Sequence, residues 1–263
     1  MTELRHLQLV ILSIIRDIDE LCIKHNIEYF LLGGSAIGAI RHKGFIPWDD
    51  DLDIIMTEDN YKKFLSVCKT ELNQNKYTLQ EGEKDWDVPF SKVRLKGTKL
   101  VEVEGSPDED MQGIFVDIFK LDNAYSSKIL QYWQYFCGKI YLSYALSRRS
   151  YKSASYKKKV LMTLAYPLRI KFIRDFFRHQ ASRLNSRDAD YLCFLYGRTK
   201  FHNTFIKREI YGKPLRVPFE DLMLPVPEHY DAYLTQMFGN YMQLPPVEQR
   251  CSLHGISIDF GKY

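Results

Sequence analysis

The sequence of 263 residues lacks several features that would assign it to a specialised class of protein. It has five cysteines, and none forms a CxxC pair, so neither a zinc site nor a thioredoxin-type redox site is indicated. Scattered cysteines of this kind favour a reducing cytoplasm. No apolar run approaches the roughly 18 residues that a spanning helix needs, and the N-terminus shows no secretory signal. We therefore expect a cytoplasmic protein, at most peripheral to the inner face of a membrane.

Neither sign of charge dominates the sequence. The formal net charge is +4 and the pI is about 8.6, which is too mild to indicate a nucleic-acid partner. Hydrophobic residues make up 45% of the chain, enough for a sizeable core. There is no internal repeat and no low-complexity linker. We expect three parts: a core at 1–122, a basic, aromatic-rich helical insert at 123–204, and a C-terminal segment at 205–263 that packs back on the core.

The N-terminal part of the chain alternates between helical and extended patterns. Apolar residues spaced three and four apart predict a helix over 3–25. Short apolar runs predict buried strands at 29–32 and 51–56. A Gly-Gly-Ser turn separates the first strand from a short helix expected at 36–41. Thr57 is placed to cap a helix that continues to about residue 72.

Further along, the pattern changes to short strands. Alternating segments predict antiparallel strands at 77–80, 90–95 and 99–103, and GIFVDIF predicts another at 113–119. The insert is expected to be mainly helical, and a C-terminal helix is expected near 228–237. Together these elements predict an α/β (α+β) fold, with a mixed sheet core flanked by helices and carrying a helical insert.

Carboxylates gather at the mouth of one predicted strand. The stretch FIPWDDDLDIIM, residues 45–56, holds four aspartates within five positions. Because side chains alternate along a strand, Asp51 and Asp53 share a face, and Asp49 joins them if the chain is extended there. Asp117 is the one charge in the apolar strand GIFVDIF, where burial demands a partner. Oxygen ligands of this kind suit Mg²⁺, so we predict that Asp51, Asp53 and Asp117 bind metal.

The same aspartates are also compatible with purely structural roles. An aspartate-rich run is often a solvated loop or a set of turn residues, and Asp117 can instead pair with a lysine or arginine. An EF-hand is excluded, because Ile54 stands where the loop needs glycine and Asn60 where it needs glutamate.

A glycine turn precedes the aspartates. In LLGGSAIGAI, Gly33, Gly34 and Ser35 follow a predicted strand and open a helix, an arrangement that lets the backbone approach an anion. A tight turn without ligand is the competing interpretation. Basic residues that can bind phosphate oxygens, and an aromatic residue that can face a quaternary ammonium group, are further candidates for substrate binding: Arg41, Lys92, Arg94 and Trp48.

The motifs GGS, IPWDDDLDI and FVDIFKLD together resemble the LicD family, within the DNA polymerase beta-like nucleotidyltransferase superfamily and related to fukutin-related proteins. The C-terminal stretch FEDLMLPVPEHYDAYLTQMFGNYM is also similar. The resemblance covers about 1–122 and 205–254, and it implies that 1–122 is a nucleotidyltransferase-like catalytic core. The aspartate motif is highly specific, whereas GGS alone is not. Lys120 stands where the family often has proline.

The resemblance implies a function. LicD-like proteins transfer phosphocholine from CDP-choline, and fukutin-related proteins transfer ribitol phosphate from another CDP-alcohol, to a hydroxyl of a glycan, with release of CMP. The expected acceptor is a cell-surface glycan such as lipopolysaccharide or teichoic acid, or its lipid-linked precursor. Asp51, Asp53 and Asp117 would hold one or two Mg²⁺ ions, or Mn²⁺, and Asp49 would assist the acceptor hydroxyl.

Two other functions stay open. The same fold can make an NDP-activated compound and release pyrophosphate, or the chain can be a non-catalytic module that binds a membrane or nucleic acid. Between 148 and 183 there are eleven Lys or Arg and one acid. That stretch predicts peripheral contact with an anionic membrane, although a solvated basic face explains it equally well.

Overall fold

The structure is a computed structural model that describes residues 1–86, 88–101, 112–148, 163, 167, 170–197, 199–250 and 257–263. The chain forms two compact units. The first unit consists of Met1–Gln80, Ser91–Phe119 and Ile210–Tyr263, and the second of Glu81–Phe90 and Lys120–Glu209.

The first unit begins with the long helix α1, Glu3–Lys24. The side chain of Thr2 caps it by accepting a hydrogen bond from the Arg5 N–H. The chain leaves the helix through Asn26, which adopts a left-handed φ of 50°. The predicted apolar stripe forms the buried face of α1, and its most deeply buried residues are Leu7, Ile11, Ile14, Ile15 and Ile18.

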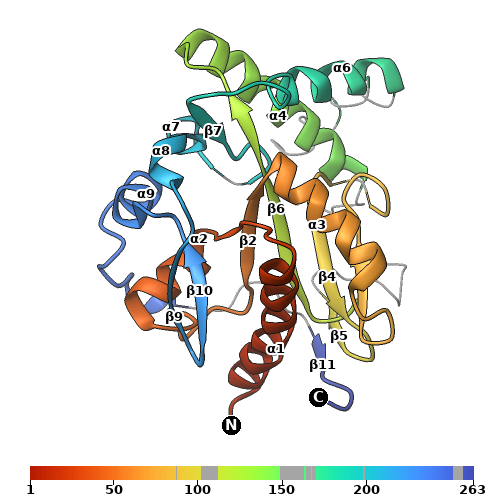
Figure 1. Ribbon diagram of the computed structural model, residues 1–263, viewed down its shortest axis with the longest axis vertical. Helices are drawn as coiled ribbons and strands as arrows, with labels where there is room; N and C mark the ends of the chain where they lie inside the picture. The colour runs from red at the N-terminus through yellow and green to blue at the C-terminus, as the bar shows by residue number, and fades with distance from the viewer. Residues whose placement is uncertain are drawn as a thin grey trace. The chain divides into compact units, whose positions relative to one another are not determined.

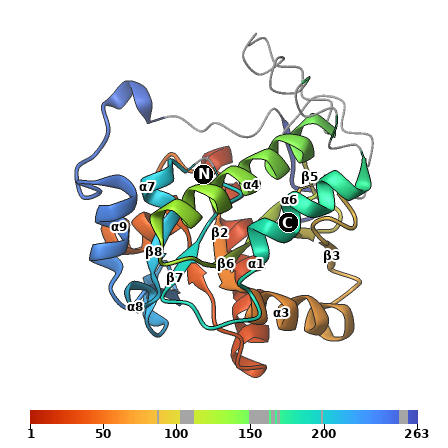
Figure 2. The same ribbon diagram turned by 90° about the horizontal axis from the view of Figure 1, so that it is seen from above.

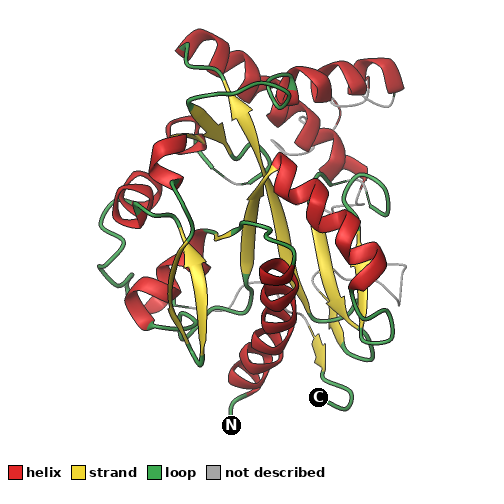
Figure 3. Cartoon of the chain, viewed as in Figure 1, coloured by secondary structure: helices red, strands yellow, loops and turns green. Residues whose placement is uncertain are grey.

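The sheet of the first unit has the order β1-β2-β6-β4-β3. Its strands are β1 (Phe30–Leu31), β2 (Asp53–Thr57), β6 (Phe115–Ala124), β4 (Ser91–Leu95) and β3 (Tyr77–Gln80). Antiparallel pairs join β1 to β2, β3 to β4 and β4 to β6, whereas β2 and β6 run side by side in the same direction (Figure 1). The sheet is therefore mixed, and helices flank it, which confirms the predicted fold class (Figure 3).

Two short helical segments differ in detail from the expected elements. The helix predicted at 36–41 begins earlier, as α2 (Gly33–Ile37), and continues as the π-helical turn η1 (Gly38–His42). Helix α3 (Glu58–Glu71) follows β2 as predicted. Thr57 occupies the N-cap position as predicted, but its side chain makes no capping bond and instead accepts from Asn60 Nδ2 at 3.1 Å. Helices α1 and α3 lie on the same side of the sheet (Figures 1 and 2).

The C-terminal residues complete the first unit. Strands β9 (Leu215–Phe219) and β10 (Leu222–Val226) form a hairpin, and helix α9 (Tyr230–Phe238) ends at Gly239, close to the predicted bounds. The remaining short elements are the helix α8 (Arg208–Tyr211), the 3₁₀ turn η4 (Val247–Gln249), and β11 (Ser257–Asp259), which pairs with β5 (Lys99–Val101). The last two residues of the strand predicted at 99–103 lie outside the described residues.

The second unit is mainly helical, as expected, but it also contains strands that the sequence did not predict. Its described residues include the helices α4 (Lys128–Arg148), α6 (Lys171–Ser182) and α7 (Phe201–Thr204). The end of β6 pairs with β7 (Tyr191–Cys193), which pairs in turn with β8 (Phe205–Lys207). Buried residues from these helices and strands form a common core: Ala124, Cys137, Tyr141, Ala181, Cys193, Leu195, Tyr196 and Phe205.

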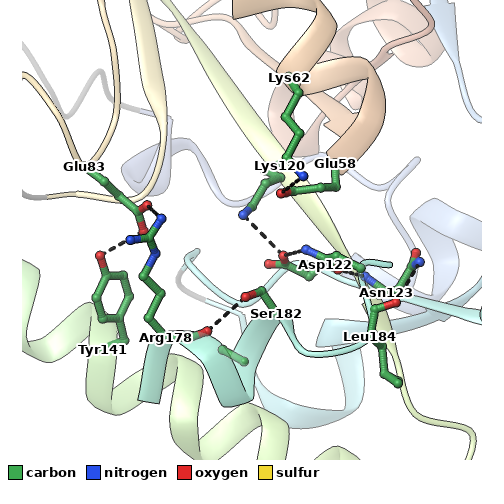
Figure 4. A network of polar contacts seen from close by, with 12 residues as sticks. Glu58, Lys62, Glu83, Lys120, Asp122, Asn123, Tyr141, Arg178, Ser182 and Leu184 are labelled. Carbon is green, nitrogen blue, oxygen red and sulfur yellow. Dashed lines mark hydrogen bonds and ion pairs between the residues drawn. The ribbon is translucent and has the colours of Figure 1, made fainter. Parts of the chain in front are cut away.

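A hydrogen bond and an ion pair connect the segment Glu81–Phe90 to two helices of the second unit (Figure 4). Glu83 accepts a hydrogen bond from the Tyr141 hydroxyl at 2.8 Å on α4, and it pairs with Arg178 on α6 at 2.8 Å. Near the end of β6, Lys120 pairs with the buried Asp122 at 3.3 Å. These charged residues therefore have structural roles within the unit.

Candidate functional site

Side chains from distant parts of the first unit fix the loop that carries the aspartates. Gln8, buried on α1, donates from Nε2 to the Asp49 carbonyl at 2.9 Å and to the Ile46 carbonyl at 3.2 Å. Arg5, one turn earlier, forms a two-pronged ion pair with Glu220 at 2.9 and 2.7 Å. Glu220 lies in the β9–β10 turn, and its N–H donates to the Lys43 carbonyl at 2.7 Å. The loop is thus held between α1 and the hairpin.

Strand pairing brings the separate aspartates together. Asp53 begins β2, and the backbone N–H of Asp117 on β6 donates to the Leu52 carbonyl at 3.1 Å. On the other side of β6, Lys92 of β4 lies directly opposite Asp117 in the register. Its Nζ is 3.1 Å from Asp117 Oδ1, and the lysine side chain is almost fully buried. Lys92 is therefore one partner of Asp117, with which it forms an ion pair.

The electrostatics of Asp53 show how closely the carboxylates gather. Burial raises the pKa of Asp53 well above its ordinary value, and the charges of Asp51, Asp117 and Asp49 raise it further. Lys92 acts in the opposite direction and lowers it. The predicted set of Asp49, Asp51, Asp53 and Asp117 therefore shares one local field.

The donor chemistry of this cluster fits a hard divalent cation. Carboxylate oxygens are the ligands that Mg²⁺ and Mn²⁺ accept, and a cation would relieve the repulsion that raises the Asp53 pKa. Within the described residues, no three His, Cys, Asp or Glu side chains are arranged as a ready metal site. Lys92 supplies a positive charge beside these carboxylates.

The glycine turn contacts the aspartates directly. Ser35 Oγ accepts a hydrogen bond from the Asp53 N–H at 2.9 Å, and Gly33 adopts a left-handed φ of 56°. A Cβ on Gly34 would lie 2.9 Å from Asp49 Oδ2, so the Asp49 carboxylate would have to shift to make room for it. The hydroxyl of Ser35 is used as an acceptor and can still donate its proton. The glycine turn and the carboxylates therefore belong to one site.

Two arginines lie close together near the aspartate loop, and one of them lies over the Trp48 ring. Arg41 donates to the Tyr241 carbonyl at 2.6 Å, and the Arg250 guanidinium lies 5.3 Å from the centre of the Trp48 ring. Burial lowers the pKa of Arg41, and the charge of Arg250 lowers it further, because like charges lie close together. The edge of His42 faces Trp48 at 6.1 Å. An anion placed here would relieve the repulsion between the guanidinium groups.

Lys92 and Arg94 are more deeply buried than surface phosphate ligands would be. Arg94 Nε donates to Gln80 Oε1 at 2.8 Å, and its Nη1 donates to the Gly113 carbonyl at 2.9 Å. Both cations lie over the ring of Phe115, Lys92 at 3.2 Å and Arg94 at 4.7 Å from its centre. Lys92 lies beside the carboxylates, whereas the observed partners of Arg94 belong to the sheet. A role for either residue in substrate binding stays a prediction.

The structure adds residues that the sequence analysis missed. Tyr233 of α9 is buried, and its hydroxyl approaches the backbone N–H of Gly33 in the glycine turn. Burial chiefly raises the pKa of Tyr233, the Gly33 N–H lowers it and the Asp53 charge raises it, so this hydroxyl lies beside the glycine turn. Gln8 and Arg250 are further additions. Nothing in the local sequence distinguishes either residue, and only tertiary packing shows that each approaches the aspartate loop.

Comparisons with known proteins agree with this arrangement. Residues 26–140 match the family model for the LicD/FKTN/FKRP nucleotidyltransferase domain. The chain is 30% identical over 261 residues to the lipopolysaccharide cholinephosphotransferase LicD of Haemophilus influenzae, covering 95% of this chain and 96% of that protein. The chain belongs to the LicD family. The LicD match of residues 26–140 spans the glycine turn and all four aspartates of the site.

Two shorter matches come from uncharacterized proteins. One, from Rickettsia typhi, is 39% identical over 82 residues, 29% of this LicD-family chain and 26% of that protein. Another, from Rickettsia prowazekii, is 52% identical over 48 residues, 18% of each chain. Among the helices of the described residues, none combines the length and the apolar content needed to cross a bilayer.

Proposed function

We propose that this LicD-family protein transfers phosphocholine, or a related phospho-alcohol, from a CDP-activated donor to a hydroxyl of a glycan such as lipopolysaccharide or its lipid-linked precursor. The observation that carries the proposal is the cluster of Asp49, Asp51, Asp53 and Asp117 beside the Gly33–Ser35 turn, in which burial, and then the neighbouring carboxylates, raise the Asp53 pKa. Carboxylates that repel one another in this way destabilise the fold unless a cation binds between them, so the cluster is a candidate cation site. The name of the Haemophilus relative suggests the group transferred and the acceptor.

In the proposed reaction, an oxygen of the acceptor attacks the phosphorus atom that carries choline. A new P–O bond forms to the acceptor, and the bond between that phosphorus and the bridging oxygen of the diphosphate breaks. CMP leaves with the bridging oxygen, and the acceptor hydroxyl gives up its proton. Asp49 is the candidate to take this proton, because its carboxylate faces the glycine turn at which the donor diphosphate would lie.

Side chains of this protein would orient the donor. Ser35 would donate its hydroxyl proton to a phosphate oxygen, and the Gly33–Gly34 backbone permits close approach. Arg41, with Arg250 beside it, would bind phosphate charge, and the Trp48 ring would face the cytosine or the quaternary ammonium.

Asp51, Asp53 and Asp117 would hold Mg²⁺ or Mn²⁺. Such an ion, when bound, neutralises charge on the transferred and leaving phosphates. Lys92, which pairs with Asp117, would keep that carboxylate aligned and limit repulsion before the ion arrives. In phosphoryl transfer the protein contributes positioning and charge stabilisation, and this set of residues supplies both.

Product analysis tests the proposal. Purified protein is incubated with CDP-choline, Mg²⁺ and a lipopolysaccharide acceptor that lacks phosphocholine, and the released products are separated by ion-exchange chromatography. The proposal predicts CMP in equal amount to phosphocholine on the acceptor, and none with Asp51→Ala. Parallel reactions contain CDP-ribitol, or CTP with phosphocholine. Pyrophosphate release from CTP, without CMP from any CDP-alcohol, would instead support the alternative nucleotidyltransferase.

A further inference from the structure

The second unit exposes large apolar side chains along two neighbouring helices. On α4, Ile129, Trp133 and Phe136 recur at intervals of four and three residues, so they lie on one side of the helix, and all three are exposed. On α6, Phe172 and Phe176 are one turn apart, and Phe172 has 80% of its surface exposed. We name these five residues the α4/α6 aromatic face. Exposure of so many adjacent apolar groups indicates an interaction surface.

Ring contacts make this face continuous across the two helices. Trp133 stacks on Phe136 with ring centres 5.9 Å apart, and Phe136 meets Phe177 edge to face at 6.2 Å. Phe177 in turn lies 5.4 Å from Phe176, and Trp133 Nε1 donates to Gln180 Oε1 at 3.4 Å. Helices α4 and α6 lie side by side in both views of the ribbon (Figures 1 and 2). The exposed rings therefore form one patch.

The charge around the patch selects its partner. Helix α4 contains no aspartate or glutamate, and Asp175 is the one acid of α6. Lys128, Lys171 and Arg178 are exposed on the same two helices. Asp175 is already within ion-pair distance of Lys171 at 3.6 Å and of Arg174 at 3.4 Å. A second copy of this surface would carry the same positive charge and repel the first. An anionic surface with an apolar layer beneath it would attract the cations and bury the rings.

We propose that the α4/α6 aromatic face docks on an anionic lipid bilayer. The two helices lie parallel to the bilayer surface, the rings enter the boundary between headgroups and acyl chains, and Lys128 and Lys171 contact lipid phosphates. Most of the basic stretch 148–183, from which a membrane contact was expected, lies outside the described residues. The contact proposed here uses its described part, α6, and adds α4, which the sequence analysis did not consider.

Vesicle co-sedimentation tests this surface without any need for catalysis, so its result is independent of the proposed transferase reaction. The full chain is mixed at 50 mM NaCl with vesicles of phosphatidylglycerol and phosphatidylcholine, or of phosphatidylcholine alone. We expect sedimentation with the anionic vesicles, weakened by 500 mM NaCl. Phe172→Ser/Phe176→Ser should lower the partition coefficient at least about tenfold, because two rings no longer enter the bilayer. The matched control, Leu215→Ser/Met223→Ser, alters two exposed apolar residues of the first unit and should bind as wild type.

A second measurement covers the case in which the double variant fails to fold. The chain has three tryptophans, so Trp48→Phe/Trp86→Phe leaves Trp133 as the single reporter. Anionic vesicles should shift its emission to shorter wavelength, and brominated lipids should quench it. The proposal is overturned if wild type does not sediment with anionic vesicles at low salt, or if a folded Phe172→Ser/Phe176→Ser protein binds as wild type. It is also overturned if Trp133 emission is unchanged by vesicles, or if the face instead mediates self-association in ultracentrifugation without lipid.

Discussion

Replacing Lys92 by methionine should destabilise the metal-free protein strongly. The ammonium group of Lys92 is buried, lies 3.1 Å from Asp117 Oδ1 and sits 3.2 Å from the centre of the Phe115 ring. Methionine keeps a similar volume but removes the charge that opposes the clustered carboxylates. Breaking a buried ion pair in this way costs about 3–5 kcal/mol. Because methionine suits an apolar pocket, we expect a net loss of about 3–4 kcal/mol, which lowers Tm by roughly 6–16 °C in a protein of this size.

Differential scanning calorimetry in EDTA and in Mg²⁺, at pH 8 and pH 5, measures this effect. The loss should be largest in EDTA at pH 8 and smaller at lower pH, because Asp53, whose pKa is raised, accepts a proton as the pH falls. Mg²⁺ should raise the Tm of Lys92→Met more than that of wild type. The control Lys99→Met, at an exposed position of β5, should shift Tm by less than about 2 °C. A Tm for Lys92→Met within about 2 °C of wild type in EDTA at pH 8 would refute the reasoning.

Three further changes test separate parts of the account. Asp53→Asn should raise the Tm of the metal-free protein at pH 8. Burial, above all, raises the Asp53 pKa, so the wild-type fold loses stability as the pH rises above about 4. The difference in Tm between Asp53→Asn and wild type should therefore vanish near pH 4. Glu220→Gln should lower the free energy of unfolding in urea at pH 7 by about 1 kcal/mol, because it removes a partly exposed ion pair with Arg5. This pair lowers the Glu220 pKa, so its stabilising effect exists above the ordinary glutamate pKa and should fade in acid. A loss at pH 3 as large as that at pH 7 would contradict this account. Tyr233→Phe should lower Tm only slightly, because the buried hydroxyl loses at most one hydrogen bond, from the Gly33 N–H, yet it should lower kcat/KM for the CDP donor about tenfold. Unaltered kinetics would remove Tyr233 from the site.

Much of the fold could be predicted because its signals are local. The apolar stripe of α1 and the alternation in β3 and β4 specify period and burial within a few residues. The strands β7 and β8 were missed because each has three residues, too short for an alternating pattern to be recognised. The early start of α2 at Gly33 was missed because glycine in a sequence indicates a turn and not a helix. In the structure Gly33 has a left-handed φ, and the helix nevertheless begins there.

The candidate site could be predicted only in part. The four aspartates were identified because a charge inside an apolar strand, as at Asp117, demands a partner. Alternation also placed Lys92 and Arg94 on one face correctly, but it could not show that this face is buried and that Arg94 bonds to Gly113. Gln8 lies 38 and 41 residues from the two loop carbonyls that it binds, and Tyr233 lies still farther along the chain from the Gly33 turn, so no local pattern could have connected them.

The most direct test of the account is the position of a metal ion. Crystals grown with Mn²⁺ and CDP-choline are measured at the manganese absorption edge, where the ion gives an anomalous peak. We predict a peak within about 2–2.5 Å of carboxylate oxygens from Asp51, Asp53 and Asp117, lost in Asp51→Ala together with CMP release. Manganese bound elsewhere, in protein that still releases CMP from CDP-choline, would contradict the central claim that these carboxylates hold the catalytic cation.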